Sequence, residues 1–364
     1  MSRPRHGGNL DWAAARAGCP PNAILDFSAS ISPLGPPQSA LAAIQSALSQ
    51  LTAYPDPNYA SLRQALARIH DLGPDWIIPG NGAAELLTWA GWDLSALAST
   101  FLIVPAFGDY WRSLKAVGAN VVPCPLELSK SIDNRDLITR GLSELISDRA
   151  RGSSEKLGLL LNNPHNPSGR LFGREELLPC LDQFALVVVD EAFMDFLSPE
   201  EEESLVEEVR DRPNLVILRS LTKFYSLPGL RLGYAIASPD RIARWQQWRD
   251  PWPVNVLAAA AGTAAVQDTE FQELSRSWLP PARELLFQGL AKIPGLKPYP
   301  SAANFLLVFS ESSVSSLQQT LLERYQILIR DCLSFPELGD RYFRVAVKTS
   351  QENLRLLEAL EEVL

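Results

Sequence analysis

Lys223 is the residue of this 364-residue chain whose type and position could most directly do chemistry. It follows an apolar run at 215–218 that predicts a buried strand, where an ammonium group is costly to bury. A lysine in a partly apolar pocket has a lowered pKa and can form a Schiff base with an aldehyde. Taken alone, a lysine at a strand end is more often a surface residue whose charge reaches water. Its neighbours therefore decide between the two interpretations.

Three side chains near Lys223 are suited to binding a phosphate monoester. Ser220 and Thr222 offer hydroxyl groups, and Arg231 offers a guanidinium that can bind two phosphate oxygens at once. A second phosphate-binding element is predicted at 80–84, where the small residues of Gly-Asn-Gly-Ala-Ala open a helix and let backbone N–H groups approach an anion. Such a turn is weak evidence by itself and gains weight only beside the other three residues.

Two further polar residues, Asp190 and Asn166, occupy positions where a cofactor ring could be held. Asp190 follows the apolar run 186–189, at the carboxyl end of a predicted strand, where α/β sheets bind ligands. A carboxylate there needs a positive partner such as a protonated ring nitrogen, although an acid can also cap the next helix. Asn166 lies between two prolines in the segment 162–169, which either holds its amide toward a ring oxygen or is only a turn.

The elements that must position these residues alternate between strands and helices. Apolar runs predict strands at 101–104, 120–122, 157–161, 186–189, 215–218 and 234–236, and helical patterns cover 39–51, 59–71 and 83–92. This alternation predicts an α/β fold with a mostly parallel sheet covered on both faces. In the first helix four apolar residues recur at helical spacing and are expected to face the core. They are Leu41, Ile44, Leu48 and Leu51.

The chain is expected to divide into three parts. Residues 1–37 are rich in proline near their end, so they cannot form a regular helix or central strand and are expected to lie as an arm over the active site. Residues 38–245 hold the predicted sheet and form the large domain. Tryptophans and prolines cluster just after residue 244, and residues 246–364 then alternate helices and strands as a smaller α+β domain.

Composition excludes several classes of protein. With 46% apolar residues, 21% charged residues and a net charge of −9, the chain is an ordinary globular protein without the basic surface that nucleic acids or anionic membranes require. Three histidines and four scattered cysteines argue against a metal site or a disulfide framework. No signal sequence or membrane-spanning stretch is found, so a cytoplasmic protein is expected.

Taken in order along the chain, these segments resemble the class I/II aminotransferase family, whose members have the fold type I architecture of pyridoxal 5′-phosphate enzymes. The most specific motif is Ser220-x-x-Lys223 followed by Arg231. The resemblance implies that Lys223 forms the Schiff base, that Asp190 pairs with the pyridine nitrogen and that Asn166 contacts the ring oxygen. The groups it assigns to the cofactor phosphate are Ser220, Thr222, Arg231 and the backbone at Gly82, Ala83 and Ala84.

The resemblance also implies aromatic contacts and a homodimer. Phe107 matches the aromatic residue that stacks on the pyridine ring, a role that Tyr110 could share, while an ordinary core position is the alternative for Phe107. Tyr59 is similar to a tyrosine that reaches the phosphate from the other subunit of a homodimer. One departure is Phe193, which stands where many relatives have tyrosine, so tuning of the Schiff base depends more heavily on Asn166.

The substrate is suggested by cations outside the cofactor motifs. Arg344 matches the arginine of this family that binds a substrate carboxylate. Arg330 is a second cation in the same predicted domain, although an exposed arginine paired with Asp331 explains it equally well. His6, on the N-terminal arm, is a third candidate for substrate binding.

One branch of the family fits the arm best. The segments 6–9 (His-Gly-Gly-Asn), 26–36 and 190–196 look most like the L-threonine-O-3-phosphate decarboxylases of cobalamin biosynthesis, with Ser30 in place of the usual asparagine. In that branch His6, Arg330 and the arm would recognise the substrate phosphate, and the product is (R)-1-aminopropan-2-yl phosphate.

Two alternatives stay open. A histidinol-phosphate aminotransferase of histidine biosynthesis would share the fold and the cofactor residues, and would use Lys223 to move a proton between Cα and the cofactor. A non-catalytic regulator that binds the cofactor is the second, but such proteins usually carry a DNA-binding module, for which this chain has neither spare length nor a basic face.

Overall fold

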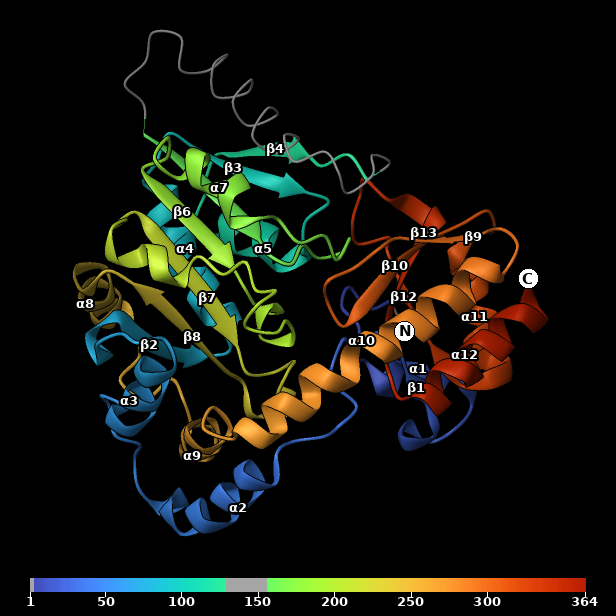
Figure 1. Ribbon diagram of the computed structural model, residues 1–364, viewed down its shortest axis with the longest axis horizontal. Helices are drawn as coiled ribbons and strands as arrows, with labels where there is room; N and C mark the ends of the chain where they lie inside the picture. The colour runs from blue at the N-terminus through green and yellow to red at the C-terminus, as the bar shows by residue number, and fades with distance from the viewer. Residues whose placement is uncertain (1–2, 129–155) are drawn as a thin grey trace, which may run out of the picture.

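A seven-stranded sheet forms the centre of the larger lobe of the computed structural model, which describes residues 3–128 and 156–364 (Figure 1). In spatial order the strands are β2 (Ile77–Asn81), β8 (Leu232–Ala237), β7 (Leu215–Ser220), β6 (Leu186–Asp190), β5 (Leu157–Asn162), β3 (Ser99–Val104) and β4 (Val121–Pro125). β8 is antiparallel to both of its neighbours, and the other strands run parallel to one another. The mostly parallel sheet is thus confirmed, although the sequence analysis missed β2.

Both faces of this sheet are covered by helices. α4 (Ala83–Ser95), α5 (Gly108–Ala116) and α8 (Pro239–Trp248) pack on one face, and α3 (Ala60–Ile69), α7 (Arg174–Leu181) and α9 (Val256–Ala265) on the other. Strand β6 shows the consequence, because Val187 and Val189 join the core on one side while Leu186 and Val188 join the core on the other. Burial on both faces explains why the central strands are continuous apolar runs.

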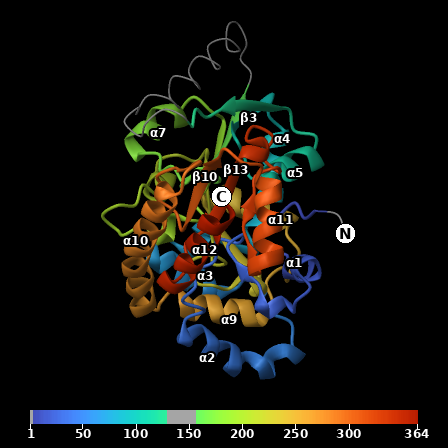
Figure 2. The ribbon, with the colours of Figure 1, turned by 90° about the vertical axis from the view of Figure 1, so that its right-hand side faces the viewer.

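The smaller lobe is built on a four-stranded antiparallel sheet in the order β12 (Arg330–Asp331), β13 (Tyr342–Ala346), β10 (Phe305–Ser310) and β9 (Leu296–Pro298). The helices α11 (Val314–Tyr325) and α12 (Ser350–Val363) lie side by side in this lobe (Figure 2). The long helix α10 (Thr269–Lys292) runs from the end of α9 into the smaller lobe (Figure 1). No helix in the described part of the chain, α10 included, is long and apolar enough to cross a membrane.

The N-terminal arm is attached at both of its ends. Near its start, α1 (Leu10–Ala17) packs on α11, and β1 (Leu25–Asp26) pairs in parallel with β11 (Ile327–Leu328). At its end, the N–H of Ser32 donates to the carbonyl of Lys223 at 3.1 Å, and the hydroxyl of Ser226 donates to the carbonyl of Ser32 at 2.7 Å. The arm therefore connects the smaller lobe with the loop that carries Lys223.

The boundary expected at residue 245 lies near the end of α8 and before α9. Helix α9 follows that boundary but packs against α3 and α2 (Gln38–Ala47), beneath the large sheet. The division into an arm, a large domain and a small domain stays a prediction. The structure adds that residues 256–265 share the core of the larger lobe.

The prediction that the apolar stripe of the first helix faces the core is wrong. In α2 and the following 3₁₀ turn, η2 (Leu48–Thr52), Leu41, Leu48 and Leu51 are 41%, 42% and 60% exposed. The buried residues of α2 are alanines, because α2 packs closely on the alanine-rich α9. Helical spacing shows which residues share a face of a helix but not which face is covered.

Candidate active site

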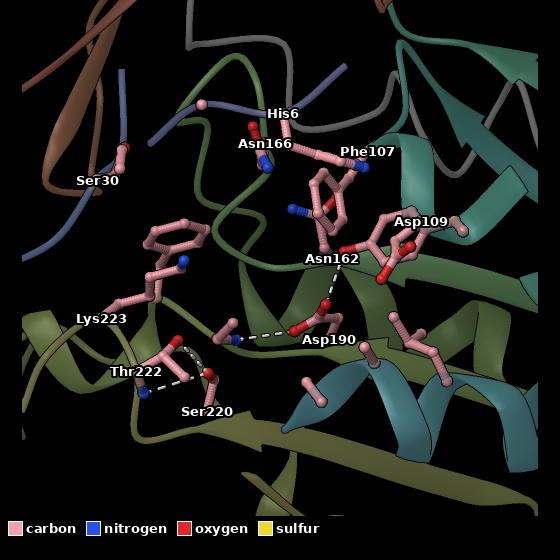
Figure 3. A pocket seen from close by; sticks show the side chains of 18 of the residues that line it. His6, Ser30, Phe107, Asp109, Asn162, Asn166, Asp190, Ser220, Thr222 and Lys223 are labelled. Atoms are coloured by element: carbon pink, nitrogen blue, oxygen red, sulfur yellow. Dashed lines mark hydrogen bonds between the residues drawn. The ribbon is translucent and has the colours of Figure 1, made fainter. Parts of the chain in front are cut away.

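A cavity of about 230 Å³ lies between the two lobes at the carboxyl edge of the large sheet (Figure 3). Its walls come from the arm, the start of α4, the loops after β3, β5, β6 and β7, and the smaller lobe. The predicted residues that line it are His6, Ala83, Ala84, Phe107, Asn166, Asp190, Ser220, Thr222, Lys223, Arg231, Arg330 and Arg344. They converge because parallel strands deliver their following loops to the same edge.

Lys223 lies on one side of this cavity, in the loop that follows β7 (Figure 3). Burial, together with the positive charges of Arg344 and Arg231, lowers the pKa of its amine to about 8, while Asp190 acts in the opposite direction. Because Lys223 is only partly exposed and lines the cavity, the alternative of a surface lysine is wrong. A large fraction of such an amine is neutral near pH 8, and the neutral amine is the form that attacks an aldehyde.

Asp190 is the last residue of β6, and its carboxylate is held by two donors. Its Oδ2 accepts from the Tyr110 hydroxyl at 2.8 Å, and its Oδ1 accepts from the N–H of Ala192 at 3.0 Å. Burial raises the pKa of Asp190, whereas both hydrogen bonds and the charge of Lys223 oppose that rise. The next helical turn, η4 (Met194–Phe196), has no side-chain cap, so Asp190 does not serve as its cap.

A cradle of hydrogen-bond donors lines the same cavity as Asp190. The hydroxyls of Ser220 and Thr222 are 2.8 Å apart, beside the first turn of α4. Gly82 precedes α4 with φ +74°, and a Cβ added there would lie 2.7 Å from Nη2 of Arg231. Glycine is thus needed at 82 for its conformation and for the approach of the guanidinium. Hydroxyls, a guanidinium and helix N–H groups together suit a phosphate dianion.

Asn166 is oriented by a residue of the smaller lobe. Nη1 of Arg344 donates to Oδ1 of Asn166, so the amide presents its Nδ2 donor to the cavity. The Arg344 guanidinium lies 4.7 Å above the ring of Phe305, and its Nε has no hydrogen-bond partner among the described residues. Burial and the charge of Arg330 lower the pKa of Arg344 to about 10. This buried cation thus has hydrogen-bonding capacity left for an anion.

Arg330 and His6 line the same side of the cavity as Arg344. Arg330 is buried and donates to the Ser334 hydroxyl at 2.6 Å and to the Arg5 carbonyl. The alternative of an exposed Arg330 paired with Asp331 is wrong, because Asp331 pairs with Arg3 at 3.1 Å.

The imidazole of His6 packs edge-on against the ring of Phe107, with the ring centroids 5.7 Å apart. Burial and nearby arginines lower the pKa of His6, although Asp109 acts against them, so the ring is a neutral hydrogen-bonding group near pH 7. Within residues 3–128 and 156–364, no three His, Cys, Asp or Glu side chains converge on a possible metal position.

Tyr59 does not belong to this site. Its side chain is 3% exposed, and its hydroxyl both donates to the carbonyl and accepts from the N–H of Val254 at 3.1 Å. The prediction that Tyr59 reaches the site of a second subunit is therefore wrong, because the group is buried and fully engaged within its own chain. Tyr54, five residues earlier, is 78% exposed and stacks on Trp252 with centroids 4.3 Å apart.

Sequence reasoning missed two contributions to the site. The Ser30 hydroxyl lines the cavity, is buried, and has no hydrogen-bond partner among the described residues. Tyr110, considered only as a ring-stacking residue, donates to Asp190 instead. Its position three residues after Phe107 on a helix was the available signal for a shared face.

The fold and the cavity together define a two-lobed α/β enzyme whose cavity holds a lysine and a strand-end carboxylate. The family model described as "Aminotransferase class I and II" matches residues 22–360, and the chain belongs to that family. The predicted fold type I architecture is thereby confirmed.

Individual relatives cover nearly the whole chain. It is 38% identical to threonine-phosphate decarboxylase of Salmonella typhimurium over 99% of this chain and 96% of the relative. It is 36% identical to histidinol-phosphate aminotransferase of Symbiobacterium thermophilum over 91% and 88% of the two chains. The crystal structure of histidinol-phosphate aminotransferase from Sinorhizobium meliloti in complex with pyridoxal-5′-phosphate shares the fold, with a TM-score of 0.83 at 24% identity, over 100% of this chain and 95% of the other.

Proposed function

We propose that this protein decarboxylates L-threonine-O-3-phosphate to (R)-1-aminopropan-2-yl phosphate and CO₂ in cobalamin biosynthesis, with pyridoxal 5′-phosphate as its cofactor. The 38% identity to a threonine-phosphate decarboxylase supports this reaction. The observation that carries it is the pair of arginines, Arg330 and Arg344, that line the same cavity as His6 and Lys223. Two adjacent cations, neither of which forms a salt bridge in the described part of the chain, suit one small substrate that carries both a carboxylate and a phosphate.

The cavity fits the proposed cofactor on several independent grounds. The cradle of Ser220, Thr222, Arg231 and the α4 N-terminus suits its phosphate, and a side chain at Gly82 would displace the Arg231 guanidinium. Asp190 would pair with the ring nitrogen. When bound, the cofactor supplies an aldehyde that captures the substrate amine and a ring that accepts the electron pair of a broken bond at Cα.

The remaining positions surround the ring. Asn166 would donate its Nδ2 hydrogen to the ring oxygen, and Phe107 would stack on the ring. Phe193 has no hydroxyl for this ring oxygen and packs on Phe305 with centroids 5.0 Å apart, so Asn166 is the residue left for that contact.

Residues of this chain can be assigned to each step of the proposed reaction. Arg344 would bind the substrate carboxylate and thereby orient the bond between Cα and the carboxyl carbon, which is the bond that must break for CO₂ to leave. The substrate phosphate would be held by His6, by Arg330 and by the part of the arm that carries Ser30. The same part of the arm would exclude water. The Lys223 amine would donate the proton that Cα takes up in place of the lost carboxyl group.

A paired assay tests the proposal against the aminotransferase alternative, which the 36% identity to a histidinol-phosphate aminotransferase favours. One sample of holoenzyme receives L-threonine-O-3-phosphate and is followed for CO₂. A second receives L-histidinol phosphate with 2-oxoglutarate and is followed for glutamate. CO₂ release without an oxo acid is expected, whereas glutamate without CO₂ would replace the proposed reaction and keep the cofactor assignments.

Arg344→Ala is expected to raise KM for L-threonine-O-3-phosphate about 100-fold, because truncating one partner of a buried charge pair costs about 3 kcal/mol. Initial rates of CO₂ release measure this effect. Arg341→Ala, an exposed arginine three residues earlier, is the matched control and is expected to leave KM unchanged. Equal KM values in the two variants would show that another group binds the carboxylate.

Cofactor uptake by the apoprotein is expected to depend on pH through Lys223. Because its pKa is lowered to about 8, the neutral amine increases as pH rises to 8 and is the main form above it. The rate constant for uptake is therefore expected to rise roughly tenfold per pH unit below pH 8 and to level off above. Stopped-flow visible absorbance measures it. A plateau already reached at pH 6.5 would contradict the assignment of Lys223.

The protein is further proposed to act as a cytoplasmic homodimer. Leu41, Leu48 and Leu51 form an exposed apolar face on α2 and η2, with Tyr54 beside them as the tyrosine available to a second subunit. The double variant Leu48→Glu with Leu51→Glu is expected to weaken association at least about 100-fold, since each leucine buried in an interface contributes about 1.5–3 kcal/mol. Light scattering at micromolar concentration should then report a monomer. Leu354→Glu, an equally exposed leucine on α12, is the control and should stay dimeric.

A further inference from the structure

Tyr110 connects two parts of the site that are far apart in the sequence. It lies on the first turn of α5, it is almost completely buried, and its hydroxyl donates to Oδ2 of Asp190 at 2.8 Å. The two residues are 80 positions apart. The other oxygen of Asp190 accepts from the N–H of Ala192, so the plane of the carboxylate is determined by one donor from the β6 turn and one from α5.

The same helical turn also holds Phe107 in place. The N–H of Tyr110 donates to the carbonyl of Phe107 at 3.0 Å, and the two rings meet edge-to-face with centroids 5.6 Å apart. Phe107 is the ring-stacking candidate and Asp190 is the partner proposed for the ring nitrogen. A movement of Tyr110 would therefore disturb both groups at once.

The surroundings of Asp190 give the tyrosine hydroxyl an electrostatic effect as well. The titratable groups that face Asp190 are Lys223 from the β7 loop and Asp109 and Tyr110 from α5. Burial raises the pKa of Asp190, and the hydrogen bond from Tyr110 opposes this rise. Burial and the neighbouring carboxylate raise the pKa of Tyr110 well above its usual value, so Tyr110 keeps its proton and stays a donor.

We propose that Tyr110 is a positioning residue for the cofactor, whose O–H group holds the Asp190 carboxylate in place and in its ionised form, ready to pair with the ring nitrogen. This inference rests on the proposed cofactor but is independent of the substrate. Tyr110 touches no reacting atom and acts entirely through Asp190. The phenyl ring fills space in the core, and the hydroxyl carries the function.

Tyr110→Phe separates the two roles, because it keeps the ring and removes the O–H group. The dissociation constant of pyridoxal 5′-phosphate from the apoprotein is expected to rise about tenfold at pH 7, since the lost hydrogen bond has a charged acceptor. The loss should grow toward pH 5.5, because Asp190 then takes up a proton at a higher pH than in the unchanged protein. Equilibrium dialysis followed by visible absorbance measures bound cofactor without any substrate.

A double-variant cycle with Asp190→Asn shows whether Tyr110 acts through Asp190. In the Asp190→Asn background, Tyr110→Phe is expected to change the dissociation constant less than twofold and to leave its pH dependence unchanged. Tyr234→Phe, another buried tyrosine whose hydroxyl lies 2.8 Å from Nε2 of His70, is the matched control and should bind the cofactor like the unchanged protein.

The outcomes separate the inference from the proposed function. If the unchanged protein binds the cofactor and Tyr110→Phe binds it equally well across the pH range, the inference is wrong and the function stands. An equal effect of Tyr110→Phe in both backgrounds would also overturn it, since Tyr110 would then act by packing. If the unchanged protein does not bind the cofactor, the proposed function itself fails.

Discussion

Lys223→Ala is expected to lower the rate of CO₂ release more than about 10³-fold and to abolish the visible absorbance band of the holoenzyme. The amine lies in the cavity, its pKa is lowered to about 8, and it is the group proposed both to bind the cofactor covalently and to donate the proton that Cα takes up after CO₂ has left. Loss of an acid–base group alone typically reduces rates by about 10²–10⁴-fold. Loss of the covalent link adds to this effect.

Borohydride reduction followed by mass spectrometry provides a second measurement for Lys223. The unchanged protein should retain a pyridoxyl group at this position, and Lys223→Ala should retain none. Lys292→Ala, at the exposed end of α10, is the matched control and should behave like the unchanged protein. If Lys223→Ala kept its biological activity, the protein would be a non-catalytic cofactor-binding regulator rather than an enzyme of this mechanism.

Asp190→Asn is expected to reduce kcat/KM by about 10²–10³-fold, the magnitude typical of removing one preorganised electrostatic group from an active site. The amide has nearly the same shape but no negative charge, so a protonated ring nitrogen would lose its partner. Kinetics with L-threonine-O-3-phosphate at saturating cofactor measure the effect. Asp190→Glu keeps the charge and should recover part of the activity.

Asp109→Asn is the matched control for Asp190→Asn. Asp109 lines the same cavity but pairs with Arg112 at 2.6 Å near the surface. Its neutralisation is expected to change kcat/KM by less than about threefold, because its partner Arg112 is half exposed and water screens this ion pair. If the two variants lost equal activity, the general charge of the cavity would be responsible rather than a specific contact of Asp190.

The cofactor segment was predictable because its residues are close together in the sequence. Ser220, Thr222 and Lys223 leave one strand within four positions, so the end of β7 is enough to bring them into a single loop. Asp190 was predictable because it ends a neighbouring apolar run, and neighbouring parallel strands end at the same edge. In both cases the chemistry depends on local geometry that the sequence pattern reports directly.

The tyrosine expected at a subunit interface and the covered face of the first helix were not predictable in the same way. Tyr59 and Tyr54 lie in one short segment with similar surroundings in the sequence, yet one is buried against Val254 and the other is exposed. The leucines of α2 have a regular helical pattern, but α9 covers the alanine side of that helix. A pattern within one element does not reveal which neighbouring element packs against it.

The sequence alone thus determined the alternating strands and helices, the strand-end lysine and carboxylate, and the donors for a phosphate, because each depends on residues within a single strand, turn or helix. Tertiary structure decided which groups meet across elements. It paired Tyr110 with Asp190, Arg344 with Asn166, and the arm with the Lys223 loop. These contacts join residues separated by 80 positions or more. They form only when packing of both faces of the sheet and of the two lobes brings distant segments together, and no local spacing in the chain records that packing.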